Sequence, residues 1–203
     1  MQNHDPAKVQ RERLVRETIQ QMSAAAAYMH ECGVMHRDIK LQNIGIVNTS
    51  GERLRLILLD FGHAIKQSYS RDHLKGTIRY LAPEVLALKT NPALPAYTFS
   101  VDVWALGVVA LELIVGQRVR DPPDQLDVSS LQLELVDDGS DASLYSLIRR
   151  MLKKNEKRRP TMSDLEKEIR GKRPREPDDD SGRERPSGFS RRIVIPLLPH
   201  QLE

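Results

Sequence analysis

The sequence has few of the features that mark secreted or membrane proteins. It contains one cysteine among 203 residues, Cys32, so no disulfide can form within the chain. The longest apolar stretch, from Val101 to Val115, is too short to cross a bilayer and includes Asp102 and Glu112. The first residues are polar, which is not typical of a signal peptide. We therefore expect an intracellular protein with no membrane partner.

The chain also has little net charge and no repeats. It carries 31 basic and 28 acidic residues, which leaves a formal net charge of +3. Because the two signs are interspersed, no strong field favours nucleic acid, and we expect no nucleic-acid partner. None of the 11 glycines belongs to a Gly-x-Gly-x-x-Gly loop. The length suits one domain with one sizeable core.

A dense group of reactive side chains occupies residues 36–43, His-Arg-Asp-Ile-Lys-Leu-Gln-Asn. Asp38 can accept a proton, Lys40 can bind phosphate and Asn43 can bind a metal ion. Together they supply what phosphoryl transfer requires. The alternative interpretation is a charged surface turn.

Hydrophobic spacing places this loop between a helix and a hairpin. Apolar residues recur every three or four positions over residues 9–31, which predicts an amphipathic helix closed by Gly33. Residues 44–47 and 54–59 predict two strands joined by a turn at 48–51. The second strand leads into Asp60-Phe61-Gly62, where a carboxylate after a buried strand can hold a divalent cation. Taken alone, this tripeptide fits any junction between a strand and a turn.

Further helices are predicted in the second half of the chain. Residues 101–115 are apolar on most faces, which is typical of a helix in the middle of a core. Ser100 is a candidate cap for that helix, and Ser163 for a last helix that reaches residue 170. Leucines and other apolar residues predict a helix over 144–152. Residues 121–139 predict a loop with at most a short helix.

These motifs, in this order, resemble the C-terminal lobe of the eukaryotic protein kinases. The resemblance rests on five features: His36-Arg37-Asp38, Asp60-Phe61-Gly62, the segment from Gly76-Thr77 to Ala82-Pro83-Glu84, the helix predicted over 101–115, and Arg159. It implies a mainly α fold, a helical bundle around a buried helix with a small β-hairpin. Residues 1–170 would be this domain and 171–203 a charged, largely disordered tail. Lys40 and Thr77 favour the Ser/Thr branch.

The resemblance also implies a role for each residue of the motifs. Asp38 would accept the proton of a substrate hydroxyl, Lys40 would steady the phosphoryl group, and Thr77 would brace both. Asn43 and Asp60 would bind Mg²⁺, and ATP would be the phosphoryl donor. Protein substrates would follow from the family.

Other residues would hold this machinery in place. Asp102 would anchor the backbone of the loop, or it would simply be a helix-terminal charge. Arg159 would form a buried ion pair with Glu84. A phosphate on the activation segment would pair with Arg37, unless the hydroxyls there are merely solvated. The remaining candidates are the stacking or turn residues His36, Phe61 and Gly62, and the phosphorylation sites Ser68, Tyr69 and Ser70.

Several family features are missing from the sequence. A kinase N-lobe supplies a Gly-rich loop, a strand lysine and a helix glutamate around ATP, and none of these is present in the sequence. Gly45 also stands where an apolar floor residue for adenine is usual. We therefore expect an exposed cleft that a partner chain could cover. The open alternatives are a non-catalytic binding module or pseudokinase scaffold, and a small-molecule phosphotransferase of the same fold.

Overall fold

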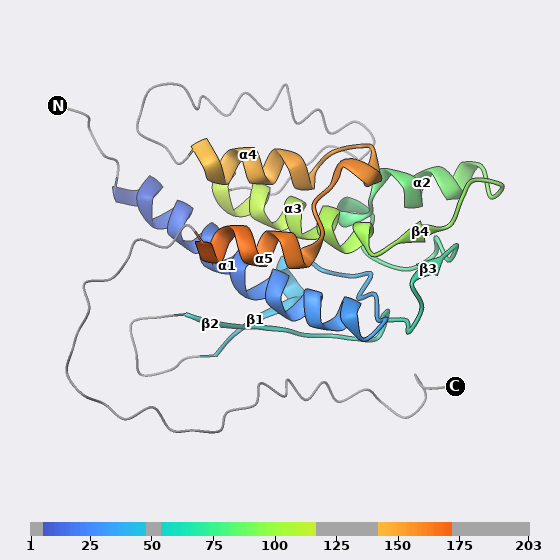
Figure 1. The fold of residues 1–203 in the computed structure, drawn as a ribbon, viewed down its shortest axis with the longest axis horizontal. Coiled ribbons are helices and arrows are strands. Elements are labelled where there is room, and N and C mark those ends of the chain that lie inside the picture. The colour runs from blue at the N-terminus through green and yellow to red at the C-terminus, as the bar shows by residue number, and fades with distance from the viewer. Residues whose placement is uncertain (1–5, 48–53, 117–141, 172–203) are drawn as a thin grey trace.

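The computed structural model describes residues 6–47, 54–116 and 142–171 (Figure 1). The predicted turn at 48–51, the predicted loop at 121–139 and the tail beyond residue 171 lie outside these ranges. The helices are α1 (Pro6–Glu31), α2 (Pro83–Thr90), α3 (Ser100–Val115), α4 (Ala142–Met151) and α5 (Met162–Gly171). The strands are β1 (Ile44–Val47), β2 (Arg55–Leu58), β3 (Tyr69–Ser70) and β4 (Tyr97–Thr98). The described part is mainly helical, so the predicted fold class is confirmed.

Helix α3 forms the centre of the core. Its side chains are buried on almost every face, and Trp104, Leu106 and Leu111 are fully inaccessible. Helices α1 and α4 pack against it, and α5 packs on α1. Each large apolar side chain removed from water in this way contributes roughly 1.5–3 kcal/mol. The apolar run that predicted a central helix therefore accounts for the middle of the bundle.

Helix α1 buries the stripe that the spacing predicts, including Val15, Ile19 and Met22. It begins at Pro6, earlier than predicted, because proline is well suited to a first turn that needs no N–H. Gly33 closes the helix with φ +75°. Its N–H donates to the carbonyl of His30, and the next N–H donates to Met29.

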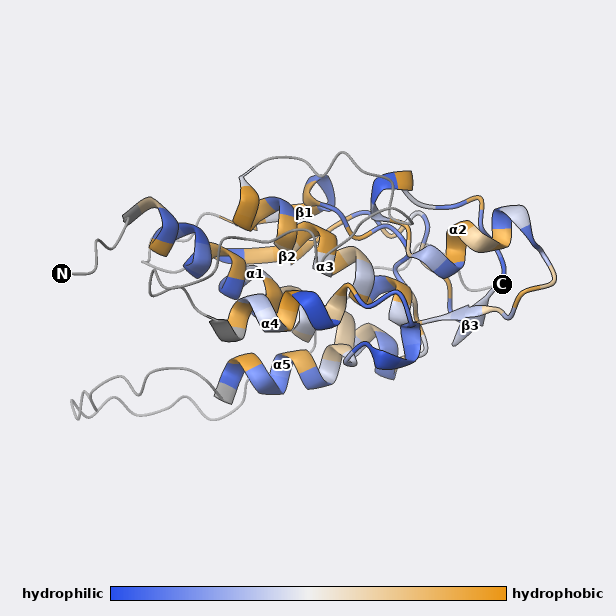
Figure 2. Ribbon diagram, turned by 90° about the horizontal axis from the view of Figure 1, so that it is seen from above, coloured by the Kyte–Doolittle hydropathy of each residue, from blue (hydrophilic) through white to orange (hydrophobic). Residues whose placement is uncertain are grey.

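Helices α4 and α5 alternate between hydrophobic and hydrophilic residues, as Figure 2 shows. The hydrophobic faces are buried, with Leu144, Ile148 and Met151 on α4 and Leu165 and Ile169 on α5. Among the described residues, none of the helices combines the length and apolar character that a membrane span requires.

Both predicted serine caps are wrong. Phe99 is the cap residue of α3, and Ser100 is already its first helical residue. The N–H of Asp164 donates to Thr161 Oγ1, and the N–H of Thr161 donates to Asp164 Oδ2, both at 3.1 Å. These two hydrogen bonds satisfy two backbone N–H groups at the start of α5, which Ser163, inside the helix, cannot do.

Strands β1 and β2 form an antiparallel hairpin with Ile44 opposite Leu58 and Val47 opposite Arg55. The side chain of Gln21, on α1, donates to the Leu54 carbonyl and accepts from the Leu56 N–H, both at 2.9 Å. One amide thus satisfies the outer edge of β2 as a third strand would. The hairpin is thereby fixed to α1, and the loop before β1 with it.

Candidate active site

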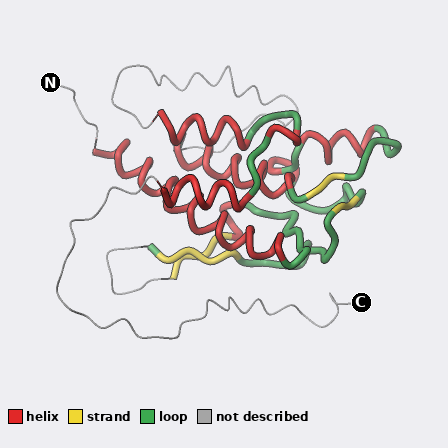
Figure 3. Tube along the Cα trace, viewed as in Figure 1, coloured by secondary structure: helices red, strands yellow, loops and turns green. Residues whose placement is uncertain are grey.

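Apart from Asp102 and Arg159, the predicted site residues lie in two segments. We call residues 36–43 the catalytic loop and residues 60–84 the activation segment. Figure 3 shows both mainly as loops gathered beside the ends of helices. They come together because β1 follows the catalytic loop, β2 returns antiparallel, and the activation segment starts where β2 ends.

Asp38 is the centre of the site. Its side chain is almost wholly buried and accepts four hydrogen bonds. Oδ1 accepts from the Thr77 N–H at 3.1 Å and from Thr77 Oγ1 at 2.9 Å. Oδ2 accepts from Lys40 Nζ at 2.7 Å and from Asn43 Nδ2 at 3.1 Å. The predicted residues Asp38, Lys40, Asn43 and Thr77 therefore form one connected group.

These bonds also fix the charge of Asp38. Burial raises the pKa of its carboxyl group, but the hydrogen bonds from Lys40 and Thr77 outweigh that effect and leave the pKa below its ordinary value. The group is consequently a carboxylate at neutral pH. A carboxylate held this rigidly can accept a hydrogen bond from an incoming hydroxyl.

Asp102, at the start of α3, holds the backbone of the catalytic loop. It accepts the N–H of His36 at 2.9 Å and the N–H of Arg37 at 2.8 Å. His30, at the end of α1, adds a bond from Nε2 at 2.9 Å. Burial raises the pKa of Asp102, but the hydrogen bonds from His30 and from the His36 backbone, with the electrostatic effect of His30, outweigh it, so the pKa is lowered. These bonds stabilise Arg37 in the left-handed region, at φ 65°.

His36 connects the catalytic loop to the activation segment. It is fully buried, with Nε2 3.1 Å from the Leu59 carbonyl and Nδ1 accepting from the Asp38 N–H at 3.3 Å. Its ring meets Phe61 edge to face, with centroids 5.2 Å apart. Burial lowers the pKa of His36, and the nearby Asp102 carboxylate offsets only part of that effect. The neutral ring can donate at one nitrogen and accept at the other.

Asn43 and Asp60 offer oxygen atoms that suit Mg²⁺. Asn43 donates its amide group to the carbonyl and side chain of Asp38, which leaves Oδ1 without a donor among the described residues. Asp60 is exposed, has φ 59°, and accepts the Gly62 N–H at Oδ1. Mg²⁺ is bound through few protein oxygens and keeps waters or phosphates. Within the described part, no group of three or more His, Cys, Asp or Glu side chains forms an alternative centre.

The β1–β2 hairpin lacks the apolar floor residue for adenine that the family usually has, because Gly45 stands at that position. An ideal Cβ on Gly45 would lie 3.0 Å from both Ile57 Cγ1 and Leu59 Cδ1. These two side chains therefore occupy the space that a floor residue would fill. Their exposed fractions are 38% and 40%, so this face of the strand that precedes Asp60 is open, whereas Leu56 on the other face is buried in the core as predicted. No described element covers this face of the hairpin.

Arg37 has an acidic partner within the activation segment. Its Nη1 lies 3.3 Å from Asp72 Oδ2 and 3.3 Å from the Tyr97 hydroxyl, and Tyr97 donates to the Asp72 carbonyl at 2.7 Å. Ser68 and Tyr69 are exposed, whereas Ser70 is buried and accepts the Asp72 N–H. The structure thus places a carboxylate, rather than one of the predicted hydroxyls, against Arg37.

Glu84 and Arg159 form a bidentate ion pair far from each other in sequence. The two Nη atoms bind the two carboxylate oxygens at 2.6 and 2.8 Å. Arg159 also donates to backbone carbonyls, including Ser100 at 3.1 Å, and lies 5.0 Å from the Trp104 ring centroid. The pair joins the end of the activation segment to α3 and to the loop before α5.

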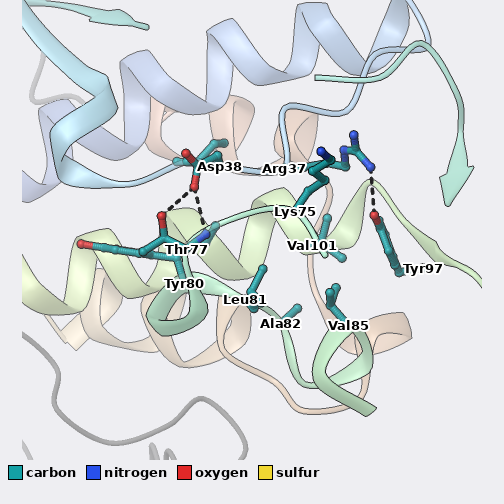
Figure 4. Close-up of a pocket in the computed structure, with 12 residues that line it drawn as sticks. Arg37, Asp38, Lys75, Thr77, Tyr80, Leu81, Ala82, Val85, Tyr97 and Val101 are labelled. Carbon is teal, nitrogen blue, oxygen red and sulfur yellow. Dashed lines mark hydrogen bonds between the residues drawn. The ribbon is translucent and has the colours of Figure 1, made fainter. Parts of the chain in front are cut away.

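A pocket opens beside Asp38 between the catalytic loop and the second half of the activation segment. In Figure 4, Asp38 and Thr77 point toward one another, while Arg37 is directed toward Tyr97. The apolar part of the lining includes Leu81, Ala82, Val85 and Val101.

Sequence reasoning missed several residues of this site. It gave no role to His30, His63 or Asp72, although each contacts a motif residue. It also missed the buried Glu112, which accepts a 2.6 Å bond from Tyr80 and lies 3.8 Å from Arg79. Burial and the bond to Glu112 raise the pKa of Tyr80. The position of Glu112 among apolar residues near the end of the stretch 101–115 was the one feature of the sequence that indicated a role for it.

The fold and this set of residues are those of the helical lobe that carries the catalytic loop in protein kinases. The family profile described as "Protein kinase domain" matches residues 2–168. The chain belongs to the protein kinase family.

Curated relatives agree with this assignment. An Aurora kinase of Eremothecium gossypii is 41% identical over 102 residues, which is 48% of this chain and 24% of that protein. Aurora kinase C of Mus musculus is 36% identical over 131 residues, covering 64% and 41%. Serine/threonine-protein kinase H1 of Homo sapiens is 38% identical over 109 residues, covering 52% and 24%. The matched part is thus about a quarter to two fifths of each of these relatives.

Proposed function

We propose that this chain takes part in ATP-dependent phosphorylation of Ser and Thr hydroxyls on protein substrates. The observation that carries the proposal is the Asp38 carboxylate, held by Lys40, Asn43 and Thr77 within hydrogen-bond distance. A relative named as a serine/threonine-protein kinase supports the choice of hydroxyl.

Each side chain of the group has a task in this proposal. Asp38 accepts the hydrogen bond, and then the proton, of the substrate hydroxyl. Lys40 uses two of its three donors on Asp38 and Thr77, which leaves one for a phosphoryl oxygen. Thr77 holds the carboxylate from the opposite side.

Asn43 Oδ1 and the Asp60 carboxylate would hold Mg²⁺. When bound, the ion neutralises negative charge on the ATP phosphates. The amide of Asn43 is oriented by Asp38, and the exposed position of Asp60 leaves its carboxylate accessible to the ion.

The pocket beside Asp38 is lined on one side by Leu81, Ala82 and Val85. These residues are buried and leave room for little more than a water molecule, so the pocket is too small to hold a substrate side chain. In protein kinases a Gly-rich loop covers the phosphates, and the sequence contains no Gly-x-Gly-x-x-Gly pattern. We infer that a partner segment over the exposed face at Ile57 and Leu59 accelerates transfer, whereas the group around Asp38 supports slow transfer without it.

Regulation through the activation segment is part of the proposal. Ser68 and Tyr69 are exposed and accessible to another kinase, whereas Ser70 is buried. Because Asp72 already faces Arg37, a phosphate would have to compete with that carboxylate.

A phosphotransfer assay tests the proposal. The full chain is incubated with labelled ATP, Mg²⁺ and peptide mixtures that offer Ser, Thr or Tyr as the acceptor. We expect label on Ser and Thr and a loss of about 10²-fold or more in Asp38→Asn, the range for removal of a general base. Glu166→Gln, a substitution on the hydrophilic face of α5, serves as the control and should leave transfer unchanged. Transfer that is equal in Asp38→Asn, or absent in the wild-type chain, contradicts the proposal.

A further inference from the structure

His63 lies next to the reacting group but has no role in the proposed chemistry. It directly follows Asp60-Phe61-Gly62, and 40% of its side chain is exposed. Its Nδ1 accepts the N–H of Gly76 at 3.2 Å and lies 3.9 Å from Asp38 Oδ2. The latter distance is longer than a hydrogen bond. The ring therefore binds Gly76 and only approaches Asp38.

The partner at Gly76 fixes the protonation of the ring. A backbone N–H can only donate, so Nδ1 of His63 must carry a free electron pair. In the neutral imidazole the proton then resides on Nε2. A leucine at this position offers no acceptor, whereas the Oδ1 of an asparagine can take the place of Nδ1.

His63 is itself held firmly, so that it can position what it binds. Its carbonyl accepts Arg37 Nε at 2.6 Å, which ties it to the catalytic loop. Gly76 has φ +92°, and an ideal Cβ there would lie 2.7 Å from the Arg37 carbonyl oxygen. The Gly76 backbone thus passes closely over the catalytic loop in a conformation that needs a specific restraint.

The next residue along the chain is Thr77, whose N–H and hydroxyl both donate to Asp38. A shift of the Gly76 peptide would move the Thr77 N–H directly. We propose that His63 is a positioning residue for phosphoryl transfer: its Nδ1 fixes the Gly76 amide and thereby holds Thr77 against Asp38. The effect of His63 on the rate rests on the proposed function, whereas the hydrogen bond between His63 and Gly76 does not.

The bond is tested in the wild-type full chain by ¹⁵N NMR of labelled histidine at a pH where the ring is neutral. His63→Asn identifies the His63 signals by their loss. We expect His63 to bear its proton on Nε2 and the Gly76 amide to exchange slowly with solvent. A proton on Nδ1 would overturn the proposal, because that nitrogen could not accept. This experiment needs neither activity nor a destabilised variant.

The positioning role is tested by kinetics of three variants. His63→Leu should lower kcat about 10-fold or more, since a misplacement of about 1 Å costs up to about 100-fold. The KM for ATP should stay within about twofold, because Asn43 and Asp60 are untouched. His63→Asn should recover most of kcat. His73→Leu is the matched control, since within the described residues the His73 ring hydrogen-bonds only to the nearby Arg71 carbonyl.

The positioning role would be overturned if kcat fell as far in His63→Asn as in His63→Leu. An unchanged kcat in His63→Leu would overturn it as well. If the wild-type chain transfers no phosphate, the proposed function fails, and the NMR result alone decides whether His63 holds Gly76.

Discussion

Replacing Glu84 by glutamine should destabilise the fold far more than an exposed charge change does. In the native chain the Arg159 side chain is inaccessible to solvent and only 15% of the Glu84 side chain is exposed. Glutamine keeps the volume of Glu84 but removes the charge. Arg159 would then be a buried cation without its counter-ion, close to Trp104.

The magnitude follows from the burial of the pair. Breaking a buried ion pair by removing one partner costs about 3–5 kcal/mol. Because Glu84 is partly exposed and backbone carbonyls still bind Arg159, we expect the lower end, about 3 kcal/mol. Urea slopes of about 2 kcal/mol per molar are usual for such chains, so the unfolding midpoint should fall by about 1.5 M.

Urea unfolding followed by circular dichroism measures this shift. The control is Glu166→Gln, which breaks the ion pair between Glu166 and Arg170. Their side chains are 22% and 52% exposed, respectively, so the loss should be at most about 1 kcal/mol. The double variant Glu84→Gln/Arg159→Met should be more stable than Glu84→Gln alone, because it no longer buries an unpaired charge. Equal midpoints for Glu84→Gln and the control would refute the reasoning.

Two further predictions concern the loop and its anchor. The lowered pKa of Asp102 means that its stabilising effect is present above the ordinary value of 3.8 and is lost as pH falls through the folded pKa. The unfolding free energy of Asp102→Asn should therefore depend less on pH below about 4 than that of the wild type, and parallel curves would contradict this. Gly76→Ala should lower Tm more than Gly33→Ala in a thermal scan. Both glycines have positive φ, but an ideal Cβ meets the Arg37 carbonyl only at Gly76 and has no neighbour within 4 Å at Gly33.

Local patterns predicted the fold well where periodicity was strong. The stripe on α1, the hairpin and the apolar helix α3 follow from hydrophobic spacing, because burial decides these elements. The cap at Ser163 was wrong because Thr161 with Asp164 satisfies the backbone donors at the start of α5. The cap at Ser100 was wrong because that residue already lies in the first turn of α3, after Phe99. Helix α2, after Ala-Pro-Glu, was missed because its eight residues are too few for a clear period.

The candidate site divides in the same way. Residues inside motifs, such as Asp38, Lys40 and Asn43, are fixed by short loop spacing and could be grouped from the sequence. Contacts that depend on how distant segments meet could be named only through the resemblance, as for Glu84 with Arg159. His63 and Asp72 belong to no motif. His63 binds a backbone N–H, which any residue has, and Asp72 binds Arg37, for which the sequence suggested a different partner.

The most direct measurement is a calorimetric titration of the full chain with ATP, with and without Mg²⁺, beside an Asp60→Asn variant. If Asn43 and Asp60 form the metal-binding part of a phosphoryl-transfer site, ATP should bind only with Mg²⁺, and affinity should fall about tenfold or more in Asp60→Asn. Absence of binding up to about millimolar ATP, or equal affinity in the variant, would contradict a nucleotide site built on these residues.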